Sequence, residues 1–243
     1  MLLLSCLFFK FSYSAKKFNA TTVDFVDVAN YSDLFMAMRK LHNSENLTND
    51  GFIIVTNSSQ YNADASNRKS VDCIVQDPLK YISSRFVSGA NDPQPWVILD
   101  FLTSKVTLRH YTLYYAYITR FMVDYVLYGE EYPGSWAVID RRVAKASDFS
   151  SFYLGGTKIY TQTYPVTTPL RNYSRFKFVG IGPNSDDMTN PNKEINDPTK
   201  ITVTMAKLLF YGTIYPGVNK YSPIKLKRKE QMMFNFAMFS SLV

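Results

Sequence analysis

The strongest constraint on the fold is a series of short apolar and aromatic runs that turn-forming residues interrupt at close intervals. Such runs are typical of β-strands when Gly, Pro, Asn and Asp separate them. The predicted strands are Phe52–Thr56, Val71–Val75, Trp96–Phe101, Val106–Tyr117, Ser135–Asp140, Arg175–Ile181 and Met205–Tyr211. No succession of helices alternates with them, so the sequence predicts an antiparallel β-sandwich or barrel. The 18 Tyr and 18 Phe residues favour the same conclusion, because aromatic side chains suit a half-buried pleated surface.

One short helix is predicted before the first of these strands. Apolar residues recur at helical spacing over Asp33–His42, and Ser32 or Asn30 can cap the helix they form. The apolar positions are Leu34, Phe35, Met38 and Leu41. Asp50-Gly51 is a turn signal and marks the expected domain boundary. The predicted organisation is an N-terminal segment over residues 1–50, a β-sandwich over 51–214 and a tail over 215–243.

Three long polar stretches, Asn57–Ser70, Lys145–Thr168 and Pro183–Thr199, are predicted to be loops. Loops carried by a rigid β-sandwich are a common place for ligands to bind.

The two ends of the chain leave the compartment open. Met1–Ser14 is apolar and ends in small residues, which resembles a short secretory signal, but no basic segment precedes it. The same residues could form an ordinary buried strand or helix. Five Asn-X-Ser/Thr triplets, beginning at Asn19, Asn30, Asn46, Asn57 and Asn172, are compatible with secretion but also arise by chance. A secreted or cell-surface location and a cytoplasmic one therefore stay open.

The positive charge of the chain is concentrated in its tail. The formal net charge is +7, and five basic residues but only one acidic residue follow Gly217. This distribution argues against a basic nucleic-acid-binding face on the main domain. A run of basic residues precedes an apolar stretch over 232–239, a combination that can bind an anionic membrane surface. The basic run consists of Lys225, Lys227, Arg228 and Lys229.

A search for catalytic motifs finds none. The two histidines, His42 and His110, have no partner at metal-binding spacing, and both are interpreted as structural. The sequence contains no nucleophile turn, no P-loop and no dinucleotide-binding loop, so the protein is predicted not to be an enzyme. Several carboxylates could offer oxygen ligands to Ca²⁺, but without EF-hand spacing no cofactor is predicted. These carboxylates are Asp72, Asp77, Asp92, Asp186 and Asp187.

Six segments, in order, resemble the coagulation factor 5/8 type C, or discoidin-like, domain family, in particular its divergent protist members. The segments are Gly51–Ser59, Asp77–Phe101, Val106–Tyr115, Tyr132–Ile139, Arg175–Asn184 and Lys207–Ile214. They resemble the family patterns "G.I.vTaSS", "D…yW.S…W…DF", "V.l..y.l", "hP.sWviegS", "yRyirf..tGpN" and "IEFFGtl", although Tyr81 stands where the second pattern has Trp. The chain departs from the family after Ile139, where Asp140-Arg141-Arg142-Val143 replaces a Gly-Ser-Asn-Asp-Gly turn.

The resemblance implies a jelly-roll β-sandwich of the galactose-binding-domain type that binds a ligand without catalysis. Its implied ligands are glycans, phospholipid head groups or proteins, held by loops at one end of the sandwich. We therefore predict a glycan-binding module, with Tyr61, Asn62, Arg85 and Asn184 as candidate ligand contacts. The alternatives are a protein–protein adaptor and a protein that binds anionic membranes through its tail.

Overall fold

The computed structural model describes residues 21–23, 33–61, 70–77, 84–89, 91–116, 121–185 and 201–215. The helical elements are α1 (Leu34–His42) and the short 3₁₀ helices η2 (Val71–Val75) and η3 (Ala146–Asp148). The strands are β1 (Thr21–Val23), β2 (Ile54–Asn57), β3 (Phe86–Val87), β4 (Trp96–Asp100), β5 (Lys105–Ala116), β6 (Asp124–Tyr132), β7 (Ser135–Val143), β8 (Phe149–Leu154), β9 (Thr157–Pro165), β10 (Asn172–Tyr173), β11 (Arg175–Gly180), β12 (Thr204–Met205) and β13 (Lys207–Tyr215).

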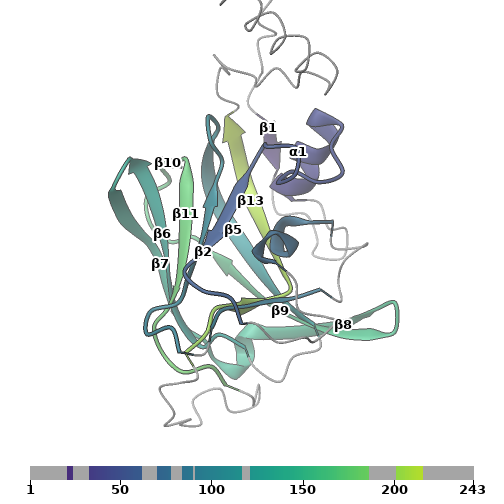
Figure 1. The fold of residues 1–243 in the computed structure, drawn as a ribbon, viewed down its shortest axis with the longest axis vertical. Helices are drawn as coiled ribbons and strands as arrows, with labels where there is room; N and C mark the ends of the chain where they lie inside the picture. The colour runs from purple at the N-terminus through teal and green to yellow at the C-terminus, as the bar shows by residue number, and fades with distance from the viewer. Residues whose placement is uncertain are drawn as a thin grey trace, which may run out of the picture.

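Two antiparallel sheets make up the body of the protein (Figure 1). One sheet has the order β1-β13-β5-β9-β8, with β10 paired to β5, and the other has the order β2-β4-β11-β6-β7. Their inner faces share one apolar cluster rich in aromatic rings, including Tyr111, Phe176, Phe178 and Phe210. The sandwich follows from strands whose alternate residues are apolar, because each sheet must bury one face. This topology confirms the predicted all-β sandwich with a short N-terminal helix.

Three predictions of local structure are corrected by the model. Val71–Val75, expected as a strand, is the 3₁₀ helix η2, and four of its five residues are buried. Lys145–Thr168, expected as a loop, contains the hairpin β8–β9. The Ser and Thr residues of this edge hairpin obscure the apolar pattern by which a strand is predicted. The strand β6 was not predicted, because its second half contains Gly129, Glu130 and Glu131.

The predicted helix is present, and its apolar face belongs to the same core as the sandwich. Leu34, Phe35 and Met38 are buried there, and the Phe35 ring lies 5.5 Å from that of Phe210 on β13. The N-cap is Asp33 rather than Ser32 or Asn30, since its Oδ1 accepts hydrogen bonds from the amides of residues 35 and 36. Residues before the boundary expected at Gly51 therefore contribute to the core of the sandwich.

Burial gives the Asp33 carboxyl an unusual titration. Burial raises its pKa from 3.8 to about 7, against the opposing effects of the amide of Met36 and the charge of Arg39. The carboxyl is protonated in the folded state at pH values where the unfolded chain has already ionised it. Between about pH 4 and pH 7 the folded state therefore holds the extra proton, and this group makes the free energy of unfolding fall as the pH rises.

We expect Asp33→Asn to remove this dependence while keeping the helix cap, because an asparagine oxygen can also accept the two amide hydrogen bonds. Relative to wild type, the variant should gain stability between pH 4.5 and pH 7.5, by on the order of 3 kcal/mol. Urea unfolding at several pH values measures this difference. Parallel pH profiles for the two proteins would contradict the assignment.

Candidate functional site

An open surface depression of about 470 Å³ lies where β2 ends and β4 begins, at one end of the sandwich. We call it the loop-end pocket. Its lining residues are Ser58, Ser59, Gln60, Tyr61, Gly89, Asn91 and Asp92. The antiparallel pairing of Asn57 with Val97 brings the two loops together, because it places the end of β2 beside the start of β4. The pocket thus joins polar side chains and one aromatic ring from two separate loops.

Asp92 organises the polar side of the loop-end pocket. Its Oδ2 accepts hydrogen bonds from the hydroxyls of Ser58 and Ser59, the second at 2.5 Å, and its Oδ1 accepts one from the amide of Gln94 at 3.1 Å. Burial acts to raise the pKa of Asp92, but these hydrogen bonds outweigh it and hold the pKa below its ordinary value. The carboxylate is therefore ionised at neutral pH and fixes the orientation of both serines.

Tyr61 supplies the aromatic surface of the pocket. The residue is 40% exposed, and its amide donates a hydrogen bond to the carbonyl of Val87 at 3.0 Å. The main chain is thereby fixed beneath a ring that is open to solvent. A fixed, partly exposed aromatic ring beside hydroxyl and carboxylate groups can meet the apolar face and the hydroxyls of a sugar together.

The other predicted contact residues have different positions. Arg85 directly precedes β3 and is half-buried, and it does not line the loop-end pocket. Asn184 is only 2% exposed, and its amide donates a hydrogen bond to the Thr202 hydroxyl at 2.6 Å, so it has little surface to offer a ligand. Asn62 and the basic tail residues 225–229 lie outside the described residues. Asp92 was overlooked as a sugar contact because its serine partners are more than 30 positions away.

A second cavity, of about 560 Å³, opens at the sheet edge where β7 faces β8 and β9. We call it the edge pocket. Its lining residues are Arg141, Arg142, Val143, Lys145, Ser147, Asp148, Ser150, Thr163, Tyr164 and Pro165. From the sequence, these residues belong to a rebuilt turn and to one of the three long loops expected to meet ligands, but none of them is among the predicted contact residues.

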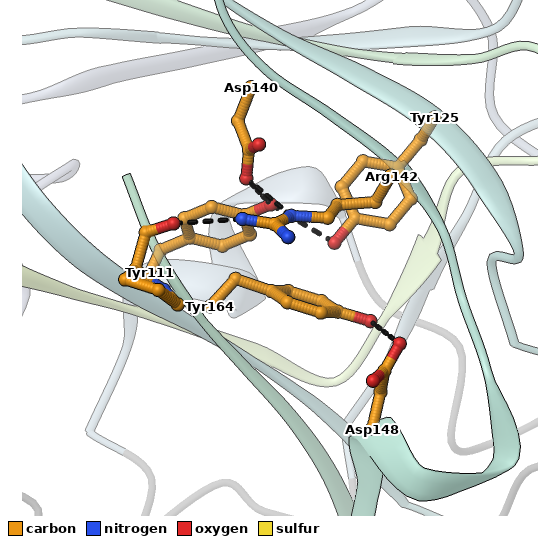
Figure 2. A network of polar contacts seen from close by, with 7 residues as sticks. Tyr111, Tyr125, Asp140, Arg142, Asp148 and Tyr164 are labelled. Atoms are coloured by element: carbon orange, nitrogen blue, oxygen red, sulfur yellow. Dashed lines mark hydrogen bonds and ion pairs between the residues drawn. The ribbon is translucent and has the colours of Figure 1, made fainter. Parts of the chain in front are cut away.

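Figure 2 shows a chain of polar side chains running from the interior of the sandwich to the edge pocket. Inside, the Tyr111 hydroxyl lies 3.2 Å from that of Tyr125 and donates to Asp140 Oδ2 at 2.9 Å. Arg142 Nε donates to the same oxygen at 2.7 Å. Burial and the Asp140 charge raise the pKa of Tyr111 well above its ordinary value, so Tyr111 stays a neutral hydrogen-bond donor.

The outer part of this chain fixes Arg142 and Tyr164 against each other. The guanidinium carbon of Arg142 lies 4.4 Å from the centre of the Tyr164 ring, and its NH2 group donates to the carbonyl of Pro165 at 2.8 Å. The Tyr164 hydroxyl in turn donates to Asp148 Oδ2 at 3.1 Å. Burial alone would lower the pKa of Arg142, but the hydrogen bond and charge of Asp140 raise it above its ordinary value. The guanidinium is consequently charged and fixed in orientation.

The two tryptophans form a third aromatic feature. Lys177 Nζ lies 5.4 Å from the centre of the Trp96 ring and 5.8 Å from that of Trp136, and the Arg175 guanidinium lies 5.3 Å from Trp136. Cations therefore already occupy part of these ring surfaces.

No protein-family model matches the chain, and no curated protein does either. Several solved structures have a similar arrangement of strands. CpGH89CBM32-5 from Clostridium perfringens, in complex with GalNAc-beta-1,3-galactose, is 11% identical over 67% of this chain and 96% of that chain, with a TM-score of 0.45. A fucolectin from striped bass (Morone saxatilis) serum is 10% identical over 69% and 48% of the two chains, with a TM-score of 0.43.

Another similar structure is chitosan-binding module 2 from the chitosanase/glucanase of Paenibacillus sp. IK-5, in complex with chitotriose. It is 12% identical over 66% of this chain and 97% of that chain, with a TM-score of 0.41. At these identities the likeness concerns the β-sandwich alone. Membership of the coagulation factor 5/8 type C family stays a prediction.

Within the described part of the chain, no three His, Cys, Asp or Glu side chains gather in a way that could hold a metal ion. Likewise, none of the helices that the model describes is long and apolar enough to span a bilayer.

Proposed function

We propose that this protein is a non-catalytic module that binds a glycan in the loop-end pocket. The observation that carries the proposal is the combination of the exposed Tyr61 ring with the Asp92 carboxylate and the two serines it orients. A sugar ring has an apolar face for the aromatic side chain and hydroxyls for the polar ones. Because the loops stand on paired strands, most of the ordering cost of the site is met by folding rather than by binding.

The volume of the loop-end pocket favours a small part of a glycan. About 470 Å³ is within the range of sites that hold small organic ligands. The polar groups present are serine hydroxyls, two side-chain amides and one carboxylate that already accepts three hydrogen bonds. This set suits one or two neutral sugar units rather than a long charged chain.

We expect Tyr61→Ala to weaken binding of the preferred neutral sugar about tenfold, which corresponds to the loss of one aromatic contact of about 1.4 kcal/mol. A panel of neutral hexoses, N-acetylhexosamines and their short oligomers identifies that sugar, and calorimetric titration measures its affinity. The matched control is Tyr132→Ala, since Tyr132 is 64% exposed at the opposite end of the sandwich.

Two outcomes would count against the proposal. One is equal loss of affinity in the Tyr61 and Tyr132 variants, which would show that the loop-end pocket is not the site. The other is an absence of binding to every sugar of the panel together with salt-sensitive binding to anionic vesicles. That result would instead favour the basic tail over 225–229.

A further inference from the structure

We propose that the edge pocket is a second binding site, specific for the carboxylate or sulfate group of an acidic saccharide. This inference does not rest on the loop-end pocket, because the edge pocket shares no lining residue with it. It rests on a preoriented guanidinium, on the charge of the lining, and on the size of the cavity.

Arg142 is positioned before any ligand arrives. Its Nε bonds Asp140, one of its terminal nitrogens bonds the Pro165 carbonyl, and its plane stacks on Tyr164. These contacts use two of the five N–H donors of a guanidinium, and the side chain is still 23% exposed. Arginine binds planar or tetrahedral oxyanions through two parallel hydrogen bonds, and fixing its orientation removes the entropy cost of doing so.

The lining of the edge pocket favours an anion. It contains the basic residues Arg141, Arg142 and Lys145 against one carboxylate, Asp148. Asp148 Oδ2 already accepts hydrogen bonds from the Tyr164 hydroxyl at 3.1 Å and from the Lys145 amide at 2.8 Å. Asp140 contacts the guanidinium but does not line the cavity. The lining itself therefore carries more cationic than anionic groups, which favours a carboxylate or sulfate group as its ligand.

Two other carboxylates contact the lining arginines from outside the pocket. Asp124, which does not line the pocket, has its Oδ2 3.8 Å from a terminal nitrogen of Arg141. The Arg141 side chain is 63% exposed, so this ion pair is solvated and weak. Asp140 is buried, and it pairs with Arg142 from the side of the interior. Its burial is costly, and apolar residues could close the same sheet edge at less cost. The cost of this buried network is explained if its role is to orient Arg142 at the surface.

The edge pocket is larger than a bare ion requires. The Thr163 hydroxyl lies 2.9 Å from that of Thr112 and is already engaged. A cavity of about 560 Å³ can hold one or two sugar units, and Ser147 and Ser150 bring hydroxyl groups to its lining. These hydroxyls can donate and accept hydrogen bonds, which matches the hydroxyls of a saccharide. An acidic sugar uses the cationic and the hydroxyl groups together, whereas free sulfate uses only the first.

The test compares four probes by calorimetric titration of the whole chain at about 50 mM ionic strength: glucuronic acid, galactose 6-sulfate, galactose and sodium sulfate. We expect at least one acidic sugar to bind about tenfold more tightly than both galactose and sodium sulfate. Its affinity should fall several-fold when the ionic strength is raised to about 500 mM, because salt screens exposed charges. Sodium sulfate that binds as tightly as both acidic sugars would overturn the saccharide assignment.

Three variants locate the binding. Arg142→Lys keeps the charge but loses the two-point contact, and should weaken acidic-sugar binding about tenfold. Lys145→Gln should weaken it about threefold and should not affect folding, because Lys145 is exposed and its main-chain amide makes the bond to Asp148. Lys158→Gln is the matched control with the same change of charge, since Lys158 is exposed at the other end of β9. Its affinity should equal that of wild type.

The Tyr61→Ala variant separates this inference from the proposed function. If it weakens binding of neutral sugars only, both sites stand. If it leaves every affinity unchanged while Lys145→Gln weakens acidic-sugar binding, the edge pocket stands and the loop-end pocket does not. If Tyr61→Ala removes acidic-sugar binding and Lys145→Gln has no effect, the edge pocket is overturned and the loop-end pocket is supported.

Discussion

A Gly212→Ala variant is expected to lose about 3 kcal/mol or more of the free energy of unfolding. Gly212 lies in β13 where its pairing with β5 shifts register, and its φ of +155° is a conformation that side chains rarely adopt. A Cβ added there would stand 2.0 Å from the carbonyl oxygen of Thr107 and 3.2 Å from the amide nitrogen of Arg109. Both are main-chain atoms of a central strand, so neither can rotate away as a side chain could.

Gly134→Ala is the matched control for this effect. Gly134 also has a positive φ, of +83°, but a Cβ there would meet nothing within 4 Å. It should therefore lose only about 1 kcal/mol, the cost of placing an L-residue in the left-handed region. Urea unfolding followed by fluorescence measures both variants. Equal losses would show that the close approach of β13 to β5 is not what requires a glycine.

The second large effect is expected for Asp140→Ala, which should lose about 3–5 kcal/mol of stability. Asp140 is 5% exposed, and one of its oxygens accepts from both Tyr111 and Arg142. Without it, the Tyr111 hydroxyl loses its acceptor inside the core, and the Arg142 charge loses its partner. A buried hydroxyl without an acceptor and a half-buried charge without its carboxylate cost more than the bonds that Asp140 makes to them contribute.

A double variant tests this reasoning. Asp140→Ala combined with Arg142→Met removes the charge that the single variant leaves unpaired, so it should recover part of the loss. Glu131→Ala is the control, because its pair with Arg171 is exposed and should be worth less than about 1 kcal/mol. A double variant that is no more stable than Asp140→Ala would show that the two residues do not act as a pair.

The strands that the sequence predicted are those with a clear apolar pattern. β4, β5 and β11 lie where the patterns over Trp96–Phe101, Val106–Tyr117 and Arg175–Ile181 placed them. Their alternate residues fill the core, so burial is encoded locally. β6 escaped detection because two of its residues serve contacts that only pairing creates. Gly129 leaves space for the Tyr173 ring. Glu130 Oε2 accepts a hydrogen bond from a terminal nitrogen of Arg175 at 2.8 Å.

The candidate sites show the same difference between residues that a local pattern predicts and residues that depend on strand pairing. Tyr61 could be predicted because a lone aromatic residue in a polar loop is visible in the sequence. Asp92 could not, because its value depends on two serines that the pairing of β2 with β4 brings to it. The Arg142 cluster was equally hidden. Its partners come from β5, β7 and β9, which belong to two different sheets and meet only when the sheets pack together.

The sequence by itself determined that this protein is an antiparallel β-sandwich with one short helix, because periodicity and turn residues act over a few neighbouring positions. The tertiary structure decided that Val71–Val75 is a 3₁₀ helix, that β8 and β9 form a hairpin, and where polar groups converge. Those features depend on contacts between residues tens of positions apart. A linear pattern does not specify them, since each arises only when strands take their register in a sheet.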